Sequence, residues 1–569
     1  MYVGIDVGGT YTDAVLMEGR TVIRKKKTPT RHENLLSSLL EALDGVLEGV
    51  KVSEIRRVVL STTLVTNIIA EKKYPPVALV IIPGPGLSHS EYRFDTLTRI
   101  LAGAIDYRGR ELVPVNKEEI ISAGNDIEEK GYTHIAVAGK FSCRNNSHEK
   151  FIKEVLEKNN PGALVEMSHT VSGRLNFPRR IATTVLTAAT KEVFFGFIRD
   201  VSGALKNRGI TAPSFILKAD GGTIPLDSGR MMPVETIFSG PAASALGAMA
   251  LSPEGQTSVV VDIGGTTTDL ALILAGEPMM ASKGALVDRF LTQVESFSVK
   301  SVPLGGDSVV TVINGKIEIL PKREGPPYCL GGKEPTPTDA LRYLDRVEAG
   351  DKARAEAIIE KLAGEAGISP GETAAEVVKR AGQIIVSAIE QMFISWEQEP
   401  AYRIWELMQR KKIRPNNVVG VGGAARGLIP GVAETMGCRA IVPEHAEVAN
   451  ALGAAVAQPT VTANVRIDTE HGIYTVAEDG KSGTVPKGRM FREEDAVKLA
   501  RDCLFKRAED LKIKEYVKKV EVVHSEVFNM VRGWTTTGKI YDITVQTPRD
   551  ILFYIEQEGS DSVWSWGKK

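Results

Sequence analysis

One octapeptide occurs twice in the chain, and it constrains the fold more than any other feature. Residues 6–13 read Asp-Val-Gly-Gly-Thr-Tyr-Thr-Asp and residues 262–269 read Asp-Ile-Gly-Gly-Thr-Thr-Thr-Asp, so six of eight positions are identical. Apolar, β-prone residues precede and follow each copy, which predicts a strand, a Gly-Gly turn and a returning strand. Two such hairpins, 256 residues apart, predict two related lobes.

The residue types in the repeat suit the binding of phosphate. Two adjacent glycines let the backbone come close to a bulky anion and present N–H groups to it, and threonines add hydroxyl donors. An aspartate at the end of the incoming strand can hold Mg²⁺ through water, and the ion would bridge phosphate oxygens. A tight β-turn capped by Asp explains a single copy equally well, but two copies on separate lobes favour a phosphate clamp. Its expected members are Gly8, Gly9, Thr10, Thr12, Gly264, Gly265, Thr266 and Thr268, with Asp6 and Asp262 as magnesium ligands.

A third glycine cluster lies late in the chain. Residues 418–427 read Val-Val-Gly-Val-Gly-Gly-Ala-Ala-Arg-Gly, and a helix is expected from about Leu428 to Met436. A strand that ends in bare backbone before a helix can accommodate a flat base and its ribose. Gly422, Gly423 and Ala424 are therefore candidates for contact with adenosine. The spacing does not match the Gly-x-Gly-x-x-Gly dinucleotide motif, and the sequence has no Gly-x-x-x-x-Gly-Lys-Ser/Thr loop.

Length and composition fit a folded protein of several domains. At 569 residues and 61.6 kDa the chain needs two or three domains. The formal net charge of −1 disfavours nucleic acid as a partner, and four cysteines without a Cys-x-x-Cys pair predict no zinc or iron–sulfur site. The first residues lack a cationic, apolar leader, and no run approaches the ~20 apolar residues of a membrane span. We therefore expect a cytoplasmic protein with no membrane partner.

Strand-like and helix-like segments alternate between the hairpins, which indicates an α/β fold. Helices are expected at 183–205 and 376–398. An ordered loop is expected at 321–338, whose Thr338-Asp339 end would cap a helix over 340–347. After Pro459 the pattern changes to a charged helix mixed with strands. The expected divisions are a first lobe with the first hairpin at 1–180, a second lobe with the second hairpin and the adenosine turn at 181–460, and a C-terminal α+β domain at 461–569.

Two Asp-x-Gly-Gly-Thr-x-Thr-Asp hairpins followed by a late Gly-Gly turn resemble the actin, sugar kinase and heat-shock ATPase superfamily. With threonines in both hairpins, the chain resembles the A-type subunits of the hydantoinase/oxoprolinase family. The resemblance extends over nearly all of residues 1–460, whereas the last 109 residues match only loosely. Further matching segments are Thr62–Asn67 with Glu71–Lys73, Asp106–Arg110, Phe141–Asn145, Ala219–Gly222, Ser239–Ala242, Gly331–Ala340, Val442–Pro443 and Ala451–Gly453.

This resemblance implies a two-lobed actin-like ATPase fold with a nucleotide cleft, plus the C-terminal α+β domain, and ATP and Mg²⁺ as cofactors. It implies an ATP-dependent attack on a small amide or cyclic imide, or the activation of a ketone, with a second, B-type subunit or a partner enzyme finishing the reaction. Asp6 and Asp262 would position Mg²⁺, and Asp13 or Asp269 would orient a hydroxyl or an attacking group.

The chain departs from the family pattern at two places on the substrate side. Relatives that open cyclic amides carry His-Gly before Thr-Thr, where this chain has Leu60-Ser61. They also carry a His ahead of a glycine-rich turn, where this chain has 300–308, Lys-Ser-Val-Pro-Leu-Gly-Gly-Asp-Ser. An imidazole is therefore missing from both positions, and we expect a divergent substrate.

Six residues are candidates for contact with the substrate, and for three of them a structural role is an equal alternative. Asp307 supplies a polar contact or caps the turn, and Glu334 and Asp339 bind substrate or cap a helix. The six candidates are Thr63, Asn67, Lys300, Asp307, Glu334 and Asp339.

Three other functions remain open from the sequence. An ATP-driven activator of a partner enzyme would use the same clamp without a small-molecule substrate. A metabolite kinase would need a base aimed at a hydroxyl, for which Asp13 could serve. An actin-like filament is least favoured because no polymer contact is indicated. Homo-oligomers are compatible with each of these functions.

Overall fold

The computed structural model describes residues 1–86, 94–228, 232–252, 255–398, 413–478, 480–487 and 490–556. Its first sheet has six strands in the order β12-β11-β4-β1-β2-β3. The first repeat forms the β1–β2 hairpin, as predicted, and β4 lies parallel to β1 on its other side. The strands are β1 (Tyr2–Val7), β2 (Tyr11–Glu18), β3 (Thr21–Pro29), β4 (Arg57–Thr62), β11 (Ser214–Leu217) and β12 (Thr223–Pro225).

The second repeat forms the equivalent hairpin in a second sheet. β13 and β14 pair antiparallel and β21 lies parallel to β13, so the arrangement of β1, β2 and β4 is reproduced. The central order is β15-β14-β13-β21-β22, and β18 pairs with β14. These strands are β13 (Ser258–Ile263), β14 (Thr268–Leu274), β15 (Glu277–Pro278), β18 (Val299–Val302), β21 (Asn417–Val421) and β22 (Arg439–Ile441).

Two helices of small residues, α7 (Ser239–Ala250) and α13 (Ala449–Val456), lie between the two sheets. α13 packs on β1, α7 packs on β13 and β14, and the two helices pack on each other. Glycines make this approach possible, because a Cβ on Gly453 would lie 1.9 Å from the Ala243 carbonyl oxygen and one on Gly247 would lie 2.0 Å from that of Ala449. Small side chains thus bring both hairpins to the same helix pair.

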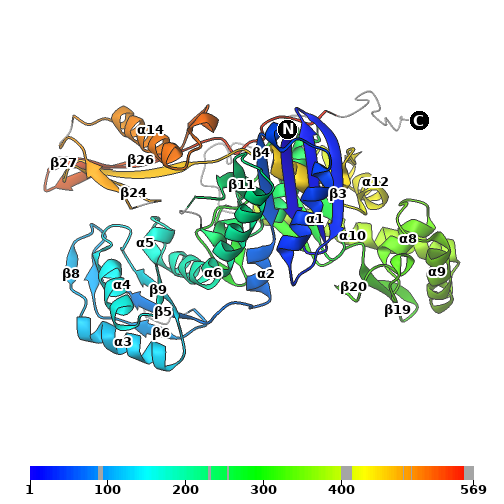
Figure 1. Ribbon diagram of the computed structural model, residues 1–569, viewed down its shortest axis with the longest axis horizontal. Helices are drawn as coiled ribbons and strands as arrows, with labels where there is room; N and C mark the ends of the chain where they lie inside the picture. Colours follow the sequence, from blue (N-terminus) through cyan, green and yellow to red (C-terminus); the bar gives the residue numbers. More distant parts are fainter. Residues whose placement is uncertain are drawn as a thin grey trace.

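The remaining helices cover the sheets and build two additional parts (Figure 1). A four-stranded sheet, β10-β9-β5-β6, packs with α3 and α4, and α6 packs on its β9 strand. In the second lobe, α8, α9 and α10 pack together near the β19–β20 hairpin. These elements are α1 (Leu35–Leu47), α2 (Leu64–Ala70), β5 (Val77–Ile82), β6 (Thr98–Ile100), β7 (Ala104–Ile105), β8 (Glu111–Val113), α3 (Lys117–Glu129), β9 (His134–Gly139), α4 (Ser147–Asn159), β10 (Leu164–Met167), α5 (Ser168–Val171), α6 (Phe177–Asn207), β16 (Leu286–Val287), β17 (Phe290–Leu291), β19 (Ser308–Ile313), β20 (Lys316–Arg323), α8 (Pro337–Tyr343), α9 (Lys352–Ala366), α10 (Pro370–Glu397) and α12 (Ala425–Met436).

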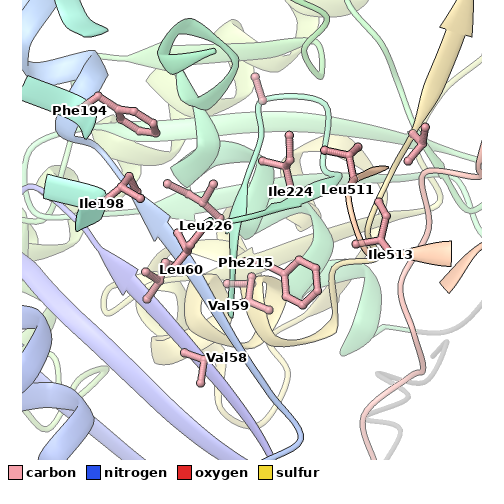
Figure 2. Packing of buried hydrophobic residues seen from close by; sticks show 14 of the residues in the cluster. Val58, Val59, Leu60, Phe194, Ile198, Phe215, Ile224, Leu226, Leu511 and Ile513 are labelled. Atoms are coloured by element: carbon pink, nitrogen blue, oxygen red, sulfur yellow. The ribbon is translucent and has the colours of Figure 1, made fainter. Parts of the chain in front are cut away.

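The C-terminal part is a five-stranded sheet with one covering helix. Its order is β25-β24-β23-β27-β26, and α14 packs on β23 and β27. Leu511 and Ile513 lie beside Phe215 and Ile224 of the first lobe, so the two parts share a core (Figure 2). The elements are β23 (Thr462–Asp468), β24 (Ile473–Val476), β25 (Ser482–Thr484), α14 (Glu493–Asp510), β26 (Glu521–Arg532) and β27 (Thr535–Gln546).

Two local features differ from expectation. The first sheet includes β11 and β12, which lie beyond residue 180, because β11 pairs in parallel with β4. The helix expected over 340–347 begins earlier, at Pro337, and its cap is Thr336 rather than Thr338-Asp339. Asp339 instead closes a reciprocal capping box with Thr336, and proline at the first helical position fits the start of a helix.

By length and composition, α6 is the one helix in the described ranges that could cross a membrane. Within the protein, 67% of its most apolar stretch is buried. Its apolar residues are therefore covered by the protein itself, as its packing on β9 illustrates.

We predict that Gly453→Ala destabilises the protein, because its methyl group would meet the Ala243 backbone, which cannot yield without separating α7 from α13. Overpacking of this kind costs about 1–3 kcal/mol. Gly364→Ala is the matched control: this glycine is exposed in α9, nothing lies within 4 Å of where a Cβ would stand, and alanine there should stabilise by about 0.5–1 kcal/mol. Urea unfolding of both variants measures the difference, and equal effects would contradict the close packing.

Candidate active site

The first hairpin presents a row of polar side chains on one face of its sheet. Asp6 lies directly opposite Asp13 on β2 and Ser61 on β4, and Asp13 lies opposite Lys27 on β3. Directly opposed residues of neighbouring strands share a face of the sheet. Ser61, Asp6, Asp13 and Lys27 therefore form one row across four strands, and the Lys27 Nζ donates to Asp13 Oδ2 at 2.9 Å.

The second hairpin presents a corresponding row. Asp262 lies opposite Asp269 on β14 and Val421 on β21, and Asp269 lies opposite Ser301 on β18. The second row repeats the pair of aspartates. It differs in its flanks, since Ser301 stands where the first row has Lys27.

Ser244 of α7 and Asn450 of α13 join the two rows. The Ser244 hydroxyl lies within hydrogen-bond distance of Asp262 Oδ2 and, at 2.9 Å, of Asn450 Oδ1. The Asn450 Nδ2 donates to Asp262 Oδ2 at 3.4 Å, and the Asn450 side chain lies close enough to Asp6 to lower the pKa of its carboxyl. One amide thus lies beside an aspartate from each hairpin, and Asp6 and Asp262 are neighbours although they come from different lobes.

The environment of the four aspartates raises the pKa of each carboxyl. Burial is the main cause at every one, and the charge of Asp262 raises the pKa of Asp6, Asp13 and Asp269 further. The pKa of Asp13 rises to about 6 although Lys27 opposes the shift, and that of Asp269 also rises to about 6. Four carboxylates in one poorly solvated region favour the binding of a cation.

The residues at this site fit Mg²⁺. Asp6 Oδ1 and Asp13 Oδ1 are buried and, in the described part of the chain, have no hydrogen-bond partner. No group of three or more His, Cys, Asp or Glu side chains in the described residues is arranged to hold a metal by itself. Mg²⁺ commonly takes one or two carboxylates and completes its shell with water and substrate phosphate. Asp6 and Asp262 meet that requirement.

The two Gly-Gly turns close in the same way. Gly8 N donates to Tyr11 O at 3.1 Å, and Gly264 N donates to Thr267 O at 3.0 Å. A Cβ on Gly9 would meet nothing within 4 Å, so the first turn has bare backbone that a ligand could approach. At Gly265 a Cβ would lie 2.7 Å from Asp307 Oδ2, so the second turn is covered on that side.

The third glycine turn lies against the second hairpin. Gly422 has φ of +87°, and a Cβ there would lie 2.4 Å from the Ile263 carbonyl oxygen. Only glycine fits this combination of left-handed backbone and close approach. Gly423 is open, and Ala424 is buried as the residue before α12. The turn therefore lies at the carboxyl ends of β13 and β21, the edge at which α/β sheets bind ligands.

The hairpin threonines divide into two pairs. Thr12 is buried and its hydroxyl lies 2.9 Å from that of Thr30, and Thr268 is buried and donates to Leu304 O at 2.7 Å. These two hydroxyls hold the hairpins in place. Thr10 and Thr266 lie in the turns, where Thr266 is exposed and Thr10 half-buried, so they remain the hydroxyls available to a phosphate.

Of the substrate-side candidates, Thr63 and Asn67 lie beside the first hairpin. Thr63 Oγ1 donates to Val7 O at 3.1 Å, and Asn67 Nδ2 donates to Thr63 Oγ1 at 3.3 Å. Asp307 lies beside the second turn, where its N–H donates to Gly265 O at 2.8 Å and its carboxylate accepts from Arg323 Nε at 3.0 Å. Asp307 thus lies at the second turn, with its backbone bonded to the turn and its carboxylate paired with Arg323.

The other three candidates are placed away from the aspartates or used structurally. Lys300 and Ser301 are adjacent on β18, so their side chains point to opposite faces of the sheet. Lys300 donates a hydrogen bond to Gln391 of α10, whereas Ser301 lies beside Asp269. Asp339 is fully buried and accepts from the backbone N–H of Tyr328, Cys329 and Thr336. Glu334 is exposed.

Sequence reasoning missed Lys27, Ser61, Ser244, Ser301 and Asn450. A signal exists for two of them, because Ser244 and Asn450 are polar residues within helices otherwise built from small apolar ones. The others depend on cross-strand register, which a single sequence does not fix.

Comparison with known proteins identifies the family. The sequence model described as hydantoinase/oxoprolinase matches residues 180–463, and that of the hydantoinase/oxoprolinase N-terminal region matches residues 2–160. The chain belongs to the hydantoinase/oxoprolinase family. The two matches include both hairpins and the third glycine turn.

Three curated relatives are subunits of enzymes. The alpha subunit of caprolactamase from Pseudomonas jessenii is 27% identical over 77% of this chain and 67% of its own length. The gamma subunit of acetophenone carboxylase from Aromatoleum aromaticum is 28% identical over 68% and 60%, respectively. The beta subunit of acetone carboxylase from Xanthobacter autotrophicus is 24% identical over 54% of this chain and 48% of its own length. The chain thus spans about two thirds or less of the length of these relatives.

Two solved structures have the same fold. Nucleotide-free acetone carboxylase and the ATP-dependent caprolactamase of Pseudomonas jessenii each give a TM-score of 0.71, with 19% identity, over 96% of this chain and 87% of theirs. The expected α/β fold, with two lobes that each carry one hairpin of the repeat, is confirmed.

We predict that the free energy of unfolding of metal-free Asp269→Asn increases relative to that of the wild type as the pH rises from 4 to 6. The native pKa of Asp269 is about 6 against 3.8 unfolded, so the folded state binds a proton more tightly in this window. The contribution of Asp269 to the stability of the wild type is therefore present below pH 4 and is lost as the pH rises through 6. This loss amounts to up to about 3 kcal/mol. Urea unfolding at each pH, with the exposed Glu334→Gln as control, measures the effect. A pH-independent difference would contradict it.

Proposed function

We propose that the protein uses ATP to phosphorylate the carbonyl oxygen of a small amide, cyclic imide or ketone. The observation that carries the proposal is the pair of aspartate rows that share Asn450 between two glycine turns. The family, and relatives named as ATP-dependent caprolactamase and as carboxylases of acetone and acetophenone, support this class of substrate.

ATP would lie with its phosphates between the two hairpin turns. Backbone N–H groups at Gly8, Gly9, Gly264 and Gly265, together with the hydroxyls of Thr10 and Thr266, would donate to the β- and γ-phosphates. Gly422, Gly423 and Ala424 would lie against adenosine. Asp6 and Asp262 would hold Mg²⁺, which would offset phosphate charge when bound.

In the proposed reaction the carbonyl oxygen attacks the γ-phosphorus, and the bond to the β–γ bridging oxygen breaks to release ADP. Water then adds to the activated carbon, and for a lactam the ring carbon–nitrogen bond breaks to leave an acyl phosphate. A second water attacks the same carbon, and the carbon–oxygen bond to phosphate breaks. One ATP and two waters thus give ADP, phosphate and the open amino acid. Asp13 or Asp269 would accept the proton of the attacking water, since a pKa near 6 suits a base at neutral pH.

A second candidate is an ATP-driven step completed on a partner protein. Lys300 and Asp339, two of the six substrate candidates, do not join the aspartates, and a partner protein would supply further contacts to the substrate. Relatives named as subunits are consistent with a second, B-type subunit that holds the substrate or finishes the reaction.

Asp262→Asn is expected to lower ATP turnover at least 100-fold, because it removes a charge from the site of the phosphates while keeping the shape of the side chain. Asp200→Asn, at an exposed aspartate of α6, is the control and should turn over ATP as wild type does. Steady-state ADP release measures both. Wild-type turnover in Asp262→Asn would refute the assignment of the site.

Isotope transfer tests the chemistry directly. ATP turnover is measured with hydantoin, 5-oxoproline, caprolactam and acetophenone, alone and with a co-purified partner, and the stimulating compound is then labelled with ¹⁸O at its carbonyl. We expect the label in inorganic phosphate, since the carbonyl oxygen leaves with phosphorus. Label retained in the organic product would contradict phosphorylation, and stimulation by protein alone would favour the activator.

A further inference from the structure

Two sequence motifs remain unexplained by the ATP site, and they meet at a cavity. Segments 106–110 and 141–145 match the family pattern, yet neither contributes to the aspartate rows. Both line a cavity of about 250 Å³ between the first lobe and the C-terminal sheet. In Figure 1 this sheet lies over the cyan part of the first lobe.

The first-lobe wall of this cavity is rigidly built. Asp106 Oδ1 accepts from the backbone N–H of Arg108 and of Arg110, both at 2.9 Å, which fixes the turn that presents Tyr107 and Arg108. Asn145 Nδ2 donates to Gly109 O at 2.9 Å, so the two motif segments are tied together. The motifs therefore serve to place side chains in the cavity.

The opposite wall is the face of the C-terminal sheet that carries no helix. Along β23, Val465 and Ile467 are buried in the core shared with α14, so Arg466 and Asp468 point to the other face. Arg466, Met530 and Ile540 line the cavity from this side. The wall thus combines a cation with apolar surface.

The cavity holds three arginines that form no ion pair with a carboxylate of the described residues. No carboxylate among the described residues forms an ion pair within 4.0 Å with Arg108, Arg144 or Arg466. Arg144 Nε is buried and, among those same residues, has no hydrogen-bond partner. The pKa of Arg466 is lowered, first by burial and then by the charge of Arg144, so two guanidinium groups lie near each other.

The nearby carboxylates offset this charge only in part. The charges of Asp542 and Asp468 raise the pKa of Arg466, but burial and the charge of Arg144 outweigh them. Asp468 Oδ1 already accepts from the backbone N–H of Glu470 and His471, and its Oδ2 lies 2.8 Å from His471 Nδ1. A buried guanidinium N–H without an acceptor is unfavourable, and an anion that binds there relieves it.

We propose that this cavity is a second ligand site, which binds the carboxylate of a small molecule between Arg144 and Arg466 and its apolar part against Met530 and Ile540. Arg108 and Tyr107 close the outer side. Guanidinium groups suit a carboxylate because they can donate two parallel hydrogen bonds to it. The site is independent of the proposed ATP chemistry, since none of its lining residues belongs to the aspartate rows.

Binding of hexanoate to the full chain, measured by ligand-observed NMR at low ionic strength, tests this site. Hexanoate is expected to bind, hexanamide is not, and Arg144→Gln and Arg466→Gln should each weaken binding at least 10-fold. Arg199→Gln, at an exposed arginine of α6, should bind as wild type does. Because replacement of Arg466 could impair folding, Arg108→Gln on the rim supplies a further variant, for which a smaller loss is expected.

Several outcomes would overturn the proposal. Failure of hexanoate to bind is one, and hexanamide binding as tightly as hexanoate is another, since it would leave the arginines no role. Inorganic phosphate binding in place of hexanoate would also overturn it, because it would indicate an anion site without the apolar part. Equal affinity in wild type and the folded Arg144→Gln and Arg466→Gln variants would place the ligand elsewhere.

Discussion

The placement of Asn450 beside an aspartate from each hairpin is the constraint on which the candidate active site depends. It holds Asp6 and Asp262 near enough for the charge of one to raise the pKa of the other. Folding therefore brings together carboxylates that repel each other and are poorly solvated. Such an arrangement costs stability, and a cation with phosphates bound to it offsets that cost.

The backbone geometry that permits this placement is set by small residues far from one another in sequence. Gly4 of β1, Gly247 of α7 and Gly453 of α13 each lie so close to another backbone that a methyl group would collide with it. The two helices are thereby wedged between sheets whose hairpins are 256 residues apart. The close packing of these helices therefore also determines where the two hairpins, and with them the candidate active site, lie.

The repeat predicts much of the site because its signal is local: the strands, the Gly-Gly turns and the aspartate pairs all lie within eight residues. What sequence could not supply is the face on which each side chain lies. The sequence favours Lys300, whereas its neighbour Ser301 lies opposite Asp269. It also groups Thr12 and Thr268 with Thr10 and Thr266, although Thr12 and Thr268 each precede an aspartate on the strand and therefore point to the other face. Asp339 is a candidate because it lies in a loop rich in glycine and proline, but its carboxylate caps the start of α8.

The ATP site and the arginine cavity oppose each other in sign, which gives a physical reason why a chain of nearly zero net charge can hold both. One gathers four carboxylates whose pKa values are raised, and the other gathers Arg108, Arg144 and Arg466 without an ion pair to a carboxylate of the described residues. In each, burial disfavours the charged form of a group that strand positions hold in place, the aspartates in one site and Arg466 in the other. The same rule therefore favours a cation with phosphate as the ligand proposed between the hairpins, and an organic anion as the ligand proposed beneath the C-terminal sheet.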